Sequence, residues 1–179
     1  MNIKEANKEL GTSYETWSEI SCHKLTEEFM EKHWEDLNKG QVSRCQKMSE
    51  KFRARHDIPL PKDNWLYFSD EQKLAEIKKC GLYELDGDSI IAYKGIRSDN
   101  YSALNFQYKY EIGSEYESTC DCTSAENSFG LSAWTLEQAR DYCDEKIIKV
   151  SIKISDLGRI VHSGGKLRCF RFKALEEIK

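Results

Sequence analysis

The stretch Ser89-Ile-Ile-Ala-Tyr-Lys-Gly-Ile96 alternates apolar and polar residues, and it is the first of four such segments in the C-terminal half of the chain. The other three segments are 104–110, 147–154 and 166–174. Successive side chains of a strand point to opposite faces, so the alternation is typical of antiparallel strands with one buried face. A short helix is predicted at 135–143, capped by Thr135 and Gln138, and it should cross one face or edge of the sheet.

The N-terminal half shows helical patterns instead. A capping box, Thr12-Ser-Tyr-Glu15, predicts the start of a long helix over 12–38 that is closed at Gly40. A second helix is predicted over 42–55, and the two should form an antiparallel pair. Both prolines fall within 56–64, so this segment is expected to be an extended connection.

A second capping box, Ser69-Asp-Glu-Gln72, predicts a third helix that runs to Cys80 and ends at Gly81 in the left-handed conformation. The turn Asp86-Gly87-Asp88 then predicts a hairpin. The fold class is therefore α+β, with N-terminal helices packed on a mainly antiparallel sheet of five to seven strands and one short crossing helix. We expect a helical N-terminal part over 1–81 and a β-rich domain over 82–179.

Composition describes a hydrated globular protein, since the 179 residues include 32% charged residues and 20 aromatic ones (four Trp, nine Tyr and seven Phe). No apolar stretch approaches the roughly 20 residues that span a bilayer, and the N-terminus lacks an apolar signal core, so a cytoplasmic protein of the host cell is expected. The net charge of −4 argues against direct nucleic-acid binding by bulk electrostatics. Four basic residues near the C-terminus are expected to form a solvated strand face: Lys166, Arg168, Arg171 and Lys173.

The seven cysteines are the compositional outlier. Without a signal peptide they are not expected to form a disulfide framework, so metal binding or plain burial must explain them. Cys120 and Cys122 could hold one zinc ion with Cys143, and His162 or Cys169 could complete the tetrahedron. The alternative is that these cysteines are small apolar core and loop residues.

Signatures of well-understood catalysts are absent from the sequence. There is no GxSxG elbow, no Walker loop and no GxGxxG, and Ser163-Gly-Gly165 fits a turn between strands better than a phosphate cradle. Glu176 and Glu177 are adjacent on a predicted strand, so their side chains should face opposite sides of it rather than form an acid/base pair. No catalytic residue is therefore assigned from motifs.

Three segments carry a resemblance to known families: Ala92-Tyr-Lys-Gly95, Tyr110-Glu-Ile-Gly-Ser-Glu-Tyr116 and Phe129-Gly-Leu-Ser-Ala-Trp-Thr-Leu-Glu-Gln-Ala139. Together with the last predicted strand, they resemble an uncharacterised domain of phages and mobile elements, over residues 89–178. The order of elements is also similar to that of an ADP-ribosyltransferase core. That resemblance implies an NAD site at Tyr93, Lys94 and Ser132 and a catalytic role for Glu176 or Glu177. Lys94 stands where that family has an arginine.

The phage-type resemblance implies a role as an inhibitor of host defence, and anti-CRISPR proteins that bind Cas9-type effectors are one such group. An acidic face could dock on the basic channel of such an effector, and Glu27, Glu28, Glu31 and Glu35 would provide it. Our first hypothesis is therefore a non-enzymatic inhibitor that binds a host defence protein and is stabilised by one zinc ion. The second hypothesis is an NAD-dependent ADP-ribosyltransferase-like enzyme.

Overall fold

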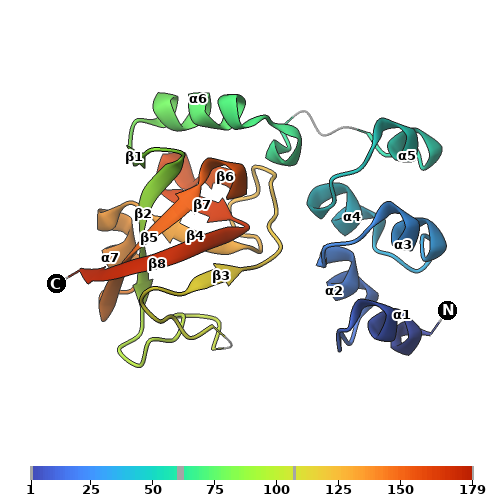
Figure 1. Ribbon diagram of the computed structural model, residues 1–179, viewed down its shortest axis with the longest axis horizontal. Helices are drawn as coiled ribbons and strands as arrows, with labels where there is room; N and C mark the ends of the chain where they lie inside the picture. Colours follow the sequence, from blue (N-terminus) through green and yellow to red (C-terminus); the bar gives the residue numbers. More distant parts are fainter. Residues whose placement is uncertain (1, 60–62, 107, 179) are drawn as a thin grey trace. The chain divides into compact units, whose positions relative to one another are not determined.

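The computed structural model describes residues 2–59, 63–106 and 108–178 and shows an α+β fold. The chain divides into two compact units, Met1–Tyr67 and Phe68–Lys179 (Figure 1). The division falls before the helix that starts at Asp70, so this helix belongs to the same unit as the sheet, whereas we expected a helical part that extends to residue 81.

The first unit consists of short helices: α1 (Ile3–Leu10), α2 (Trp17–Cys22), α3 (Glu27–Lys32), α4 (Lys39–Cys45), α5 (Glu50–Arg55) and the 3-10 turn η1 (Trp65–Tyr67). The long helices predicted over 12–38 and 42–55 are wrong. The capping box is Thr16 with Glu19 rather than Thr12 with Glu15, and Gly40 lies inside α4. Thr26 and Ser49 take extended backbone angles and cap α3 and α5, which interrupts both predicted helices.

The core of the first unit brings these helices together around Ile20, Phe29, Met30 and Phe52. Isolated helices of six or seven residues are not stable in water, so this shared apolar core is what holds them.

Two cysteines of the first unit face each other across α2 and α4, where Cys22 Sγ and Cys45 Sγ are 3.8 Å apart. We expect mild oxidation with diamide, which takes up the two thiol hydrogens, to link them. Loop closure alone contributes about 3 kcal/mol, and strain from moving the helices together reduces the net gain to about 1 kcal/mol. Peptide mapping and thermal unfolding of oxidised protein measure both effects. The Cys45→Ser variant is the control, and linkage of any other pair in the wild type contradicts the prediction.

The second unit begins with α6 (Asp70–Cys80) and confirms the predicted third helix. Ser69 and Gln72 form the capping box, and Gly81 ends the helix with a φ of 69°. The predicted hairpin is also confirmed, because β1 (Glu84–Asp86) pairs with β2 (Ser89–Ile96) across Gly87. In Figure 1, α6 runs along the upper side of this unit.

Over the described residues, the sheet has eight antiparallel strands rather than the predicted five to seven. After β2 the strands are β3 (Glu115–Glu117), β4 (Leu131–Trp134), β5 (Lys146–Lys153), β6 (Leu157–Val161), β7 (Lys166–Cys169) and β8 (Arg171–Ile178). Their order is β3-β8-β5-β2-β4-β7-β6, and β1 also pairs with β2. The predicted strands at 89–96 and 147–154 correspond to β2 and β5.

Two predicted strands are wrong. Residues 166–174 form two strands, β7 and β8, which separate at Phe170 and lie in opposite halves of the sheet. The segment 104–106 is irregular, and Lys109 makes only an isolated bridge to Tyr101, while Gln107 lies outside the described residues.

One edge of β2 is shared by two strands. Residues Ser89–Ile91 pair with β1, and Tyr93 makes the single pair with Trp134 of β4. The other edge of β2 pairs with β5 along its whole length. β2 and β4 therefore pair at one residue each, and this single pair joins the half of the sheet formed by β3, β8, β5 and β2 to the half formed by β4, β7 and β6. Lys94 follows Tyr93 and lies at this junction.

The predicted crossing helix is confirmed as α7 (Leu136–Tyr142), which Thr135 caps by accepting from Gln138 N. It packs against β2, where Tyr93 contacts the cluster of Trp134, Ala139 and Ile147. Gly95 of β2 lies directly beneath the backbone of Ala139 and Cys143, so the helix and the strand approach closely.

Candidate ligand site beside β4

Lys94 is the most unusual side chain at the junction of the sheet halves. It is 4% exposed, and its Nζ donates a hydrogen bond of 2.8 Å to the carbonyl oxygen of Ser132. Burial lowers the pKa of Lys94 to about 8, the Cys169 thiol acts in the opposite direction, and the charge of Lys166 lowers it further. In the described part of the chain, the neighbours that act on the pKa of Lys94 are thus Cys169 and Lys166, and no carboxylate is among them.

Three aromatic rings surround the Lys94 ammonium. Its Nζ lies 5.1 Å from the ring centres of Tyr110 and Trp134 and 5.9 Å from that of Phe172. Trp134 comes from β4 and Phe172 from β8, so the cage joins both halves of the sheet. The negative faces of the rings partly replace the water that the cation has lost.

The structure brings together two of the residues that the transferase resemblance implies, Lys94 and Ser132, and places the others elsewhere. Tyr93 packs towards α7. Glu176 and Glu177 lie on β8, where they pair with Lys149 at 3.3 Å and Lys146 at 3.7 Å. Because β5 and β2 separate β8 from β4, these carboxylates do not join Lys94 and Ser132.

The residue directly opposite Ser132 is Arg168 of β7. It is fully buried, so the expected solvated strand face is wrong at this position. Its Nη2 donates to the carbonyl oxygen of Thr123, whereas Nε and Nη1 have no hydrogen-bond partner among the residues that the structure describes. Arg171 and Lys173 lie on β8, where both are exposed and Arg171 pairs with Glu117.

An open depression of about 460 Å³ lies on the α7 side of β4. Its lining residues come from α7, β4, β7 and the turns beside them: Asn127, Trp134, Gln138, Asp141, Tyr142, His162 and Lys166. The rings of Trp134 and Tyr142 are stacked, with centres 4.4 Å apart and planes 24° apart. Lys166 Nζ lies 5.8 Å from the Trp134 ring centre, so one aromatic surface and one cation share this depression.

His162 and Ser163, at the rim of the depression, have φ values of 51° and 53°. Two consecutive non-glycine residues in the left-handed region are costly, and such residues cluster at functional sites. The turn joins β6 to β7, which agrees with the hairpin predicted at 163–165. His162 Nδ1 lies 3.6 Å from a carboxylate oxygen of Glu126.

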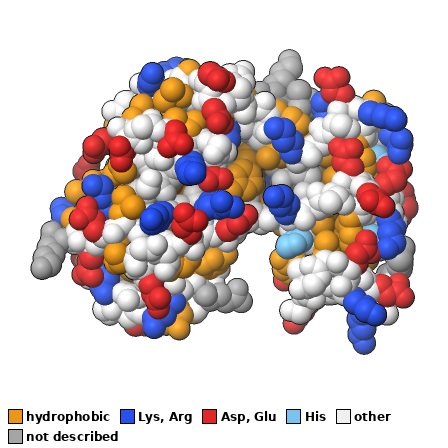
Figure 2. All heavy atoms as spheres, in the orientation of Figure 1, with side chains coloured by type: hydrophobic (Ala, Val, Ile, Leu, Met, Phe, Trp, Pro, Cys, Tyr) orange, Lys and Arg blue, Asp and Glu red, His pale blue; other side chains and the backbone are white. Residues whose placement is uncertain are grey.

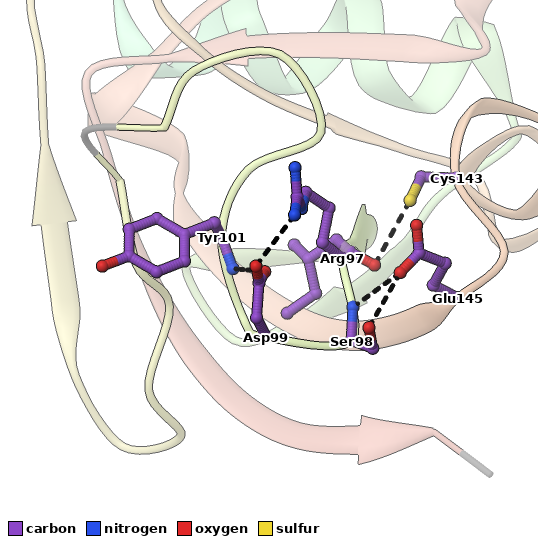
Figure 3. Close-up of polar contacts among 7 residues, drawn as sticks. Arg97, Ser98, Asp99, Tyr101, Cys143 and Glu145 are labelled. Atoms are coloured by element: carbon purple, nitrogen blue, oxygen red, sulfur yellow. Dashed lines mark hydrogen bonds and ion pairs between the residues drawn. The ribbon is translucent and has the colours of Figure 1, made fainter.

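Of the predicted zinc ligands, Cys120 and Cys122 are close enough for their thiols to interact, with Cys169 also near Cys120, whereas Cys143 lies beside Ile96 and His162 beside Glu126. Cys120 and Cys122 are buried, and their thiols donate to the carbonyl oxygens of Asp121 and Cys120. The Cys143 thiol donates to Ile96 O at 3.3 Å, beside the bonds that Glu145 accepts from Ser98 (Figure 3). No group of three or more His, Cys, Asp and Glu side chains within 2–59, 63–106 and 108–178 is placed to hold a metal, and zinc binding stays a prediction.

The predicted acidic docking face belongs to the first unit, where three of its four carboxylates have partners in the same unit. Glu27 accepts from the backbone N and Oγ of Ser49, Glu31 pairs with Arg55 and His56, and Glu35 pairs with Lys39. Glu28 lines a shallow groove beside Phe52. Acidic and basic side chains are interspersed over the face shown in Figure 2. Binding to a host defence protein stays a prediction.

Comparison with known proteins gives no match: no family model fits the chain, and no curated protein or solved structure is similar to it. The helices in the described ranges are all too short or too polar to cross a membrane. The resemblances to a phage domain and to ADP-ribosyltransferases therefore stay predictions. The candidate site rests on its own geometry. Of its residues, Tyr110, Trp134 and Phe172 carried no functional signal in the sequence, and Arg168 was expected on a solvated strand face.

Proposed function

We propose that the second unit is a binding module for a nucleotide-class ligand, held in the depression beside β4. The observation that carries this proposal is the stacked pair of Trp134 and Tyr142 with Lys166 above Trp134. A base can stack on an aromatic surface, and a phosphate can pair with a neighbouring cation. Tyr142 is 39% exposed, so part of its ring is accessible to a ligand.

The same geometry favours binding over turnover. Lys94, which stands where the transferase resemblance places an arginine, is enclosed by three rings. The strand next to β4 presents Arg168 opposite Ser132 instead of a carboxylate. A glutamate that acts in catalysis must reach the reacting atoms, and both predicted glutamates lie two strands beyond Lys94. We therefore propose a non-enzymatic module.

The test is a titration of the full chain with adenosine, ADP and NAD, followed by tryptophan fluorescence and calorimetry. We expect saturable binding that weakens about tenfold in Tyr142→Ala, since one stacked ring contributes on the order of 1–3 kcal/mol. Lys39→Gln is a control for a change outside the depression, because Lys39 lies 5.6 Å from the Trp34 ring in the other unit. Binding that Tyr142→Ala leaves unchanged contradicts the proposal. Release of nicotinamide from NAD supports the transferase hypothesis instead.

A further inference from the structure

Arg168 presents the least satisfied charged group around the depression. A buried guanidinium has five N–H donors to satisfy, and leaving such donors without partners is costly. In the described residues one nitrogen, Nη2, donates to Thr123 O, and the Nε and Nη1 donors remain buried and unpaired. Arginine presents these donors as a planar fork that matches two oxygens of a phosphate.

Arg168 lies on the same face of β7 as Lys166, which lines the depression. The two cations are close enough to interact: burial lowers the pKa of Lys166 first, and the charge of Arg168 lowers it further, while Glu126 acts in the opposite direction. In the pairing of β7 with β4, Lys166 lies opposite Trp134 and Arg168 lies opposite Ser132. Lys166 at the depression and the buried Arg168 are therefore neighbouring cations on one face of the sheet.

The segment 123–128 connects Arg168 with the depression. Thr123 supplies the carbonyl that the guanidinium contacts, and Asn127 lines the depression. The segment is held at its base by Asp121, whose carboxylate accepts from Thr123 N and Ser128 Oγ. Glu126, whose side chain is 62% exposed, reaches His162 at the rim. This carboxylate thus occupies the position in which an incoming anion would meet His162 and Lys166.

We propose that Arg168 and Lys166 form the phosphate subsite of the ligand site, and that Glu126 is the internal anion that a phosphate displaces. The inference rests on the proposed nucleotide site and adds to it the group that the cations recognise. Entry of a phosphate requires Thr123, whose carbonyl contacts the guanidinium, to move aside. No bond is made or broken in this exchange of one anion for another.

The experiment compares the affinities of adenosine, ADP and inorganic pyrophosphate for the wild-type chain, Arg168→Gln and Glu126→Gln. In the wild type we expect ADP to bind about tenfold or more tightly than adenosine, because a bidentate charge-assisted contact is that strong. Arg168→Gln should remove most of this preference for ADP, and Lys166 should retain the remainder. Glu126→Gln removes the competing carboxylate and should increase the preference for ADP. Lys39→Gln in the first unit serves as the charge-matched control.

Equal affinities of the wild type for ADP and adenosine overturn the inference and leave the nucleotide proposal intact. A folded Arg168→Gln variant that keeps the full preference for ADP over adenosine also overturns the inference and leaves the nucleotide proposal intact. If Arg168→Gln does not fold, the Glu126→Gln variant tests the inference instead. A preference for ADP over adenosine that is the same in Glu126→Gln as in the wild type then overturns the inference. If neither adenosine nor ADP binds, the nucleotide proposal fails, and the pyrophosphate measurement decides the anion site alone. Protection of the wild type against thermal unfolding by pyrophosphate, enhanced in Glu126→Gln, supports that site, and no protection overturns it.

Discussion

Replacement of Lys94 by methionine is expected to raise the free energy of unfolding at neutral pH by about 2 kcal/mol. The pKa of Lys94 is lowered from 10.5 to about 8 by burial, so its charged form costs the folded state about 3 kcal/mol at neutral pH. Methionine has a similar length, fits between the three rings and carries no charge. It loses the hydrogen bond to Ser132 O, worth about 1 kcal/mol, which leaves the expected net gain.

The pH dependence of the difference in unfolding free energy between the wild type and Lys94→Met tests whether the charge of Lys94 is its cause. Because the folded pKa is lower than the unfolded one, the unfolded chain binds an extra proton between about pH 8 and pH 10.5. The wild type therefore gains stability relative to Lys94→Met as the pH rises through this window. Below pH 8 the free energy of unfolding of the wild type is lower than that of Lys94→Met by the full amount. Titrations of other groups occur in both proteins and largely cancel in the comparison.

Urea unfolding of both proteins, at neutral pH and at about pH 10, measures the effect. Lys94→Gln is the control: it also removes the charge but buries a polar amide among the rings, so its stability should lie between those of the other two proteins. A Lys94→Met protein that is less stable than the wild type at neutral pH would show that the cation is a net stabilising part of the aromatic cage.

Local signals predicted the two helices and the first hairpin of the second unit. Capping by Ser69 and Thr135 and the turn at Gly87 act within a few residues, so the structure agrees with the sequence there. The strand 166–174 failed because alternation continues through Phe170 while the pairing partners change from β4 and β6 to β3 and β5. Pairing partners are long-range properties, and a single sequence does not contain them.

The first unit and the site show the same limit. Thr12 and Thr16 both begin a capping-box pattern, and packing of α2 against α4, not propensity, decides between them. The resemblance to an ADP-ribosyltransferase core implied that Lys94 lies near Ser132. It was not enough to find Arg168, because its place opposite Ser132 depends on the register between β4 and β7. The alternating pattern of β7 instead suggested a solvated face.

Replacement of Gly95 by alanine is expected to lower the free energy of unfolding of the second unit by about 3 kcal/mol or more. A Cβ at this position would lie 2.5 Å from Ala139 O and still closer to Cys143 O. Both obstacles are backbone atoms at the end of α7, so no side chain can rotate away to make room. Overpacking of this kind costs about 1–3 kcal/mol or more, and the rigid neighbours place this site at the upper end.

The change also has a functional consequence, because α7 carries Gln138, Asp141 and Tyr142 into the depression. Displacement of α7 from β2 should separate Tyr142 from Trp134 and weaken nucleotide binding in parallel with stability. Urea unfolding and the ADP titration measure the two effects. Gly40→Ala is the control. Gly40 lies inside α4, where an added Cβ would meet only Asn38 Oδ1, at 3.4 Å. Alanine at this position should stabilise the first unit by about 0.5–1 kcal/mol. If Gly95→Ala unfolds at the same urea concentration as the wild type, the close approach of α7 to β2 is not a constraint on this fold, and the glycine after Lys94 needs another explanation.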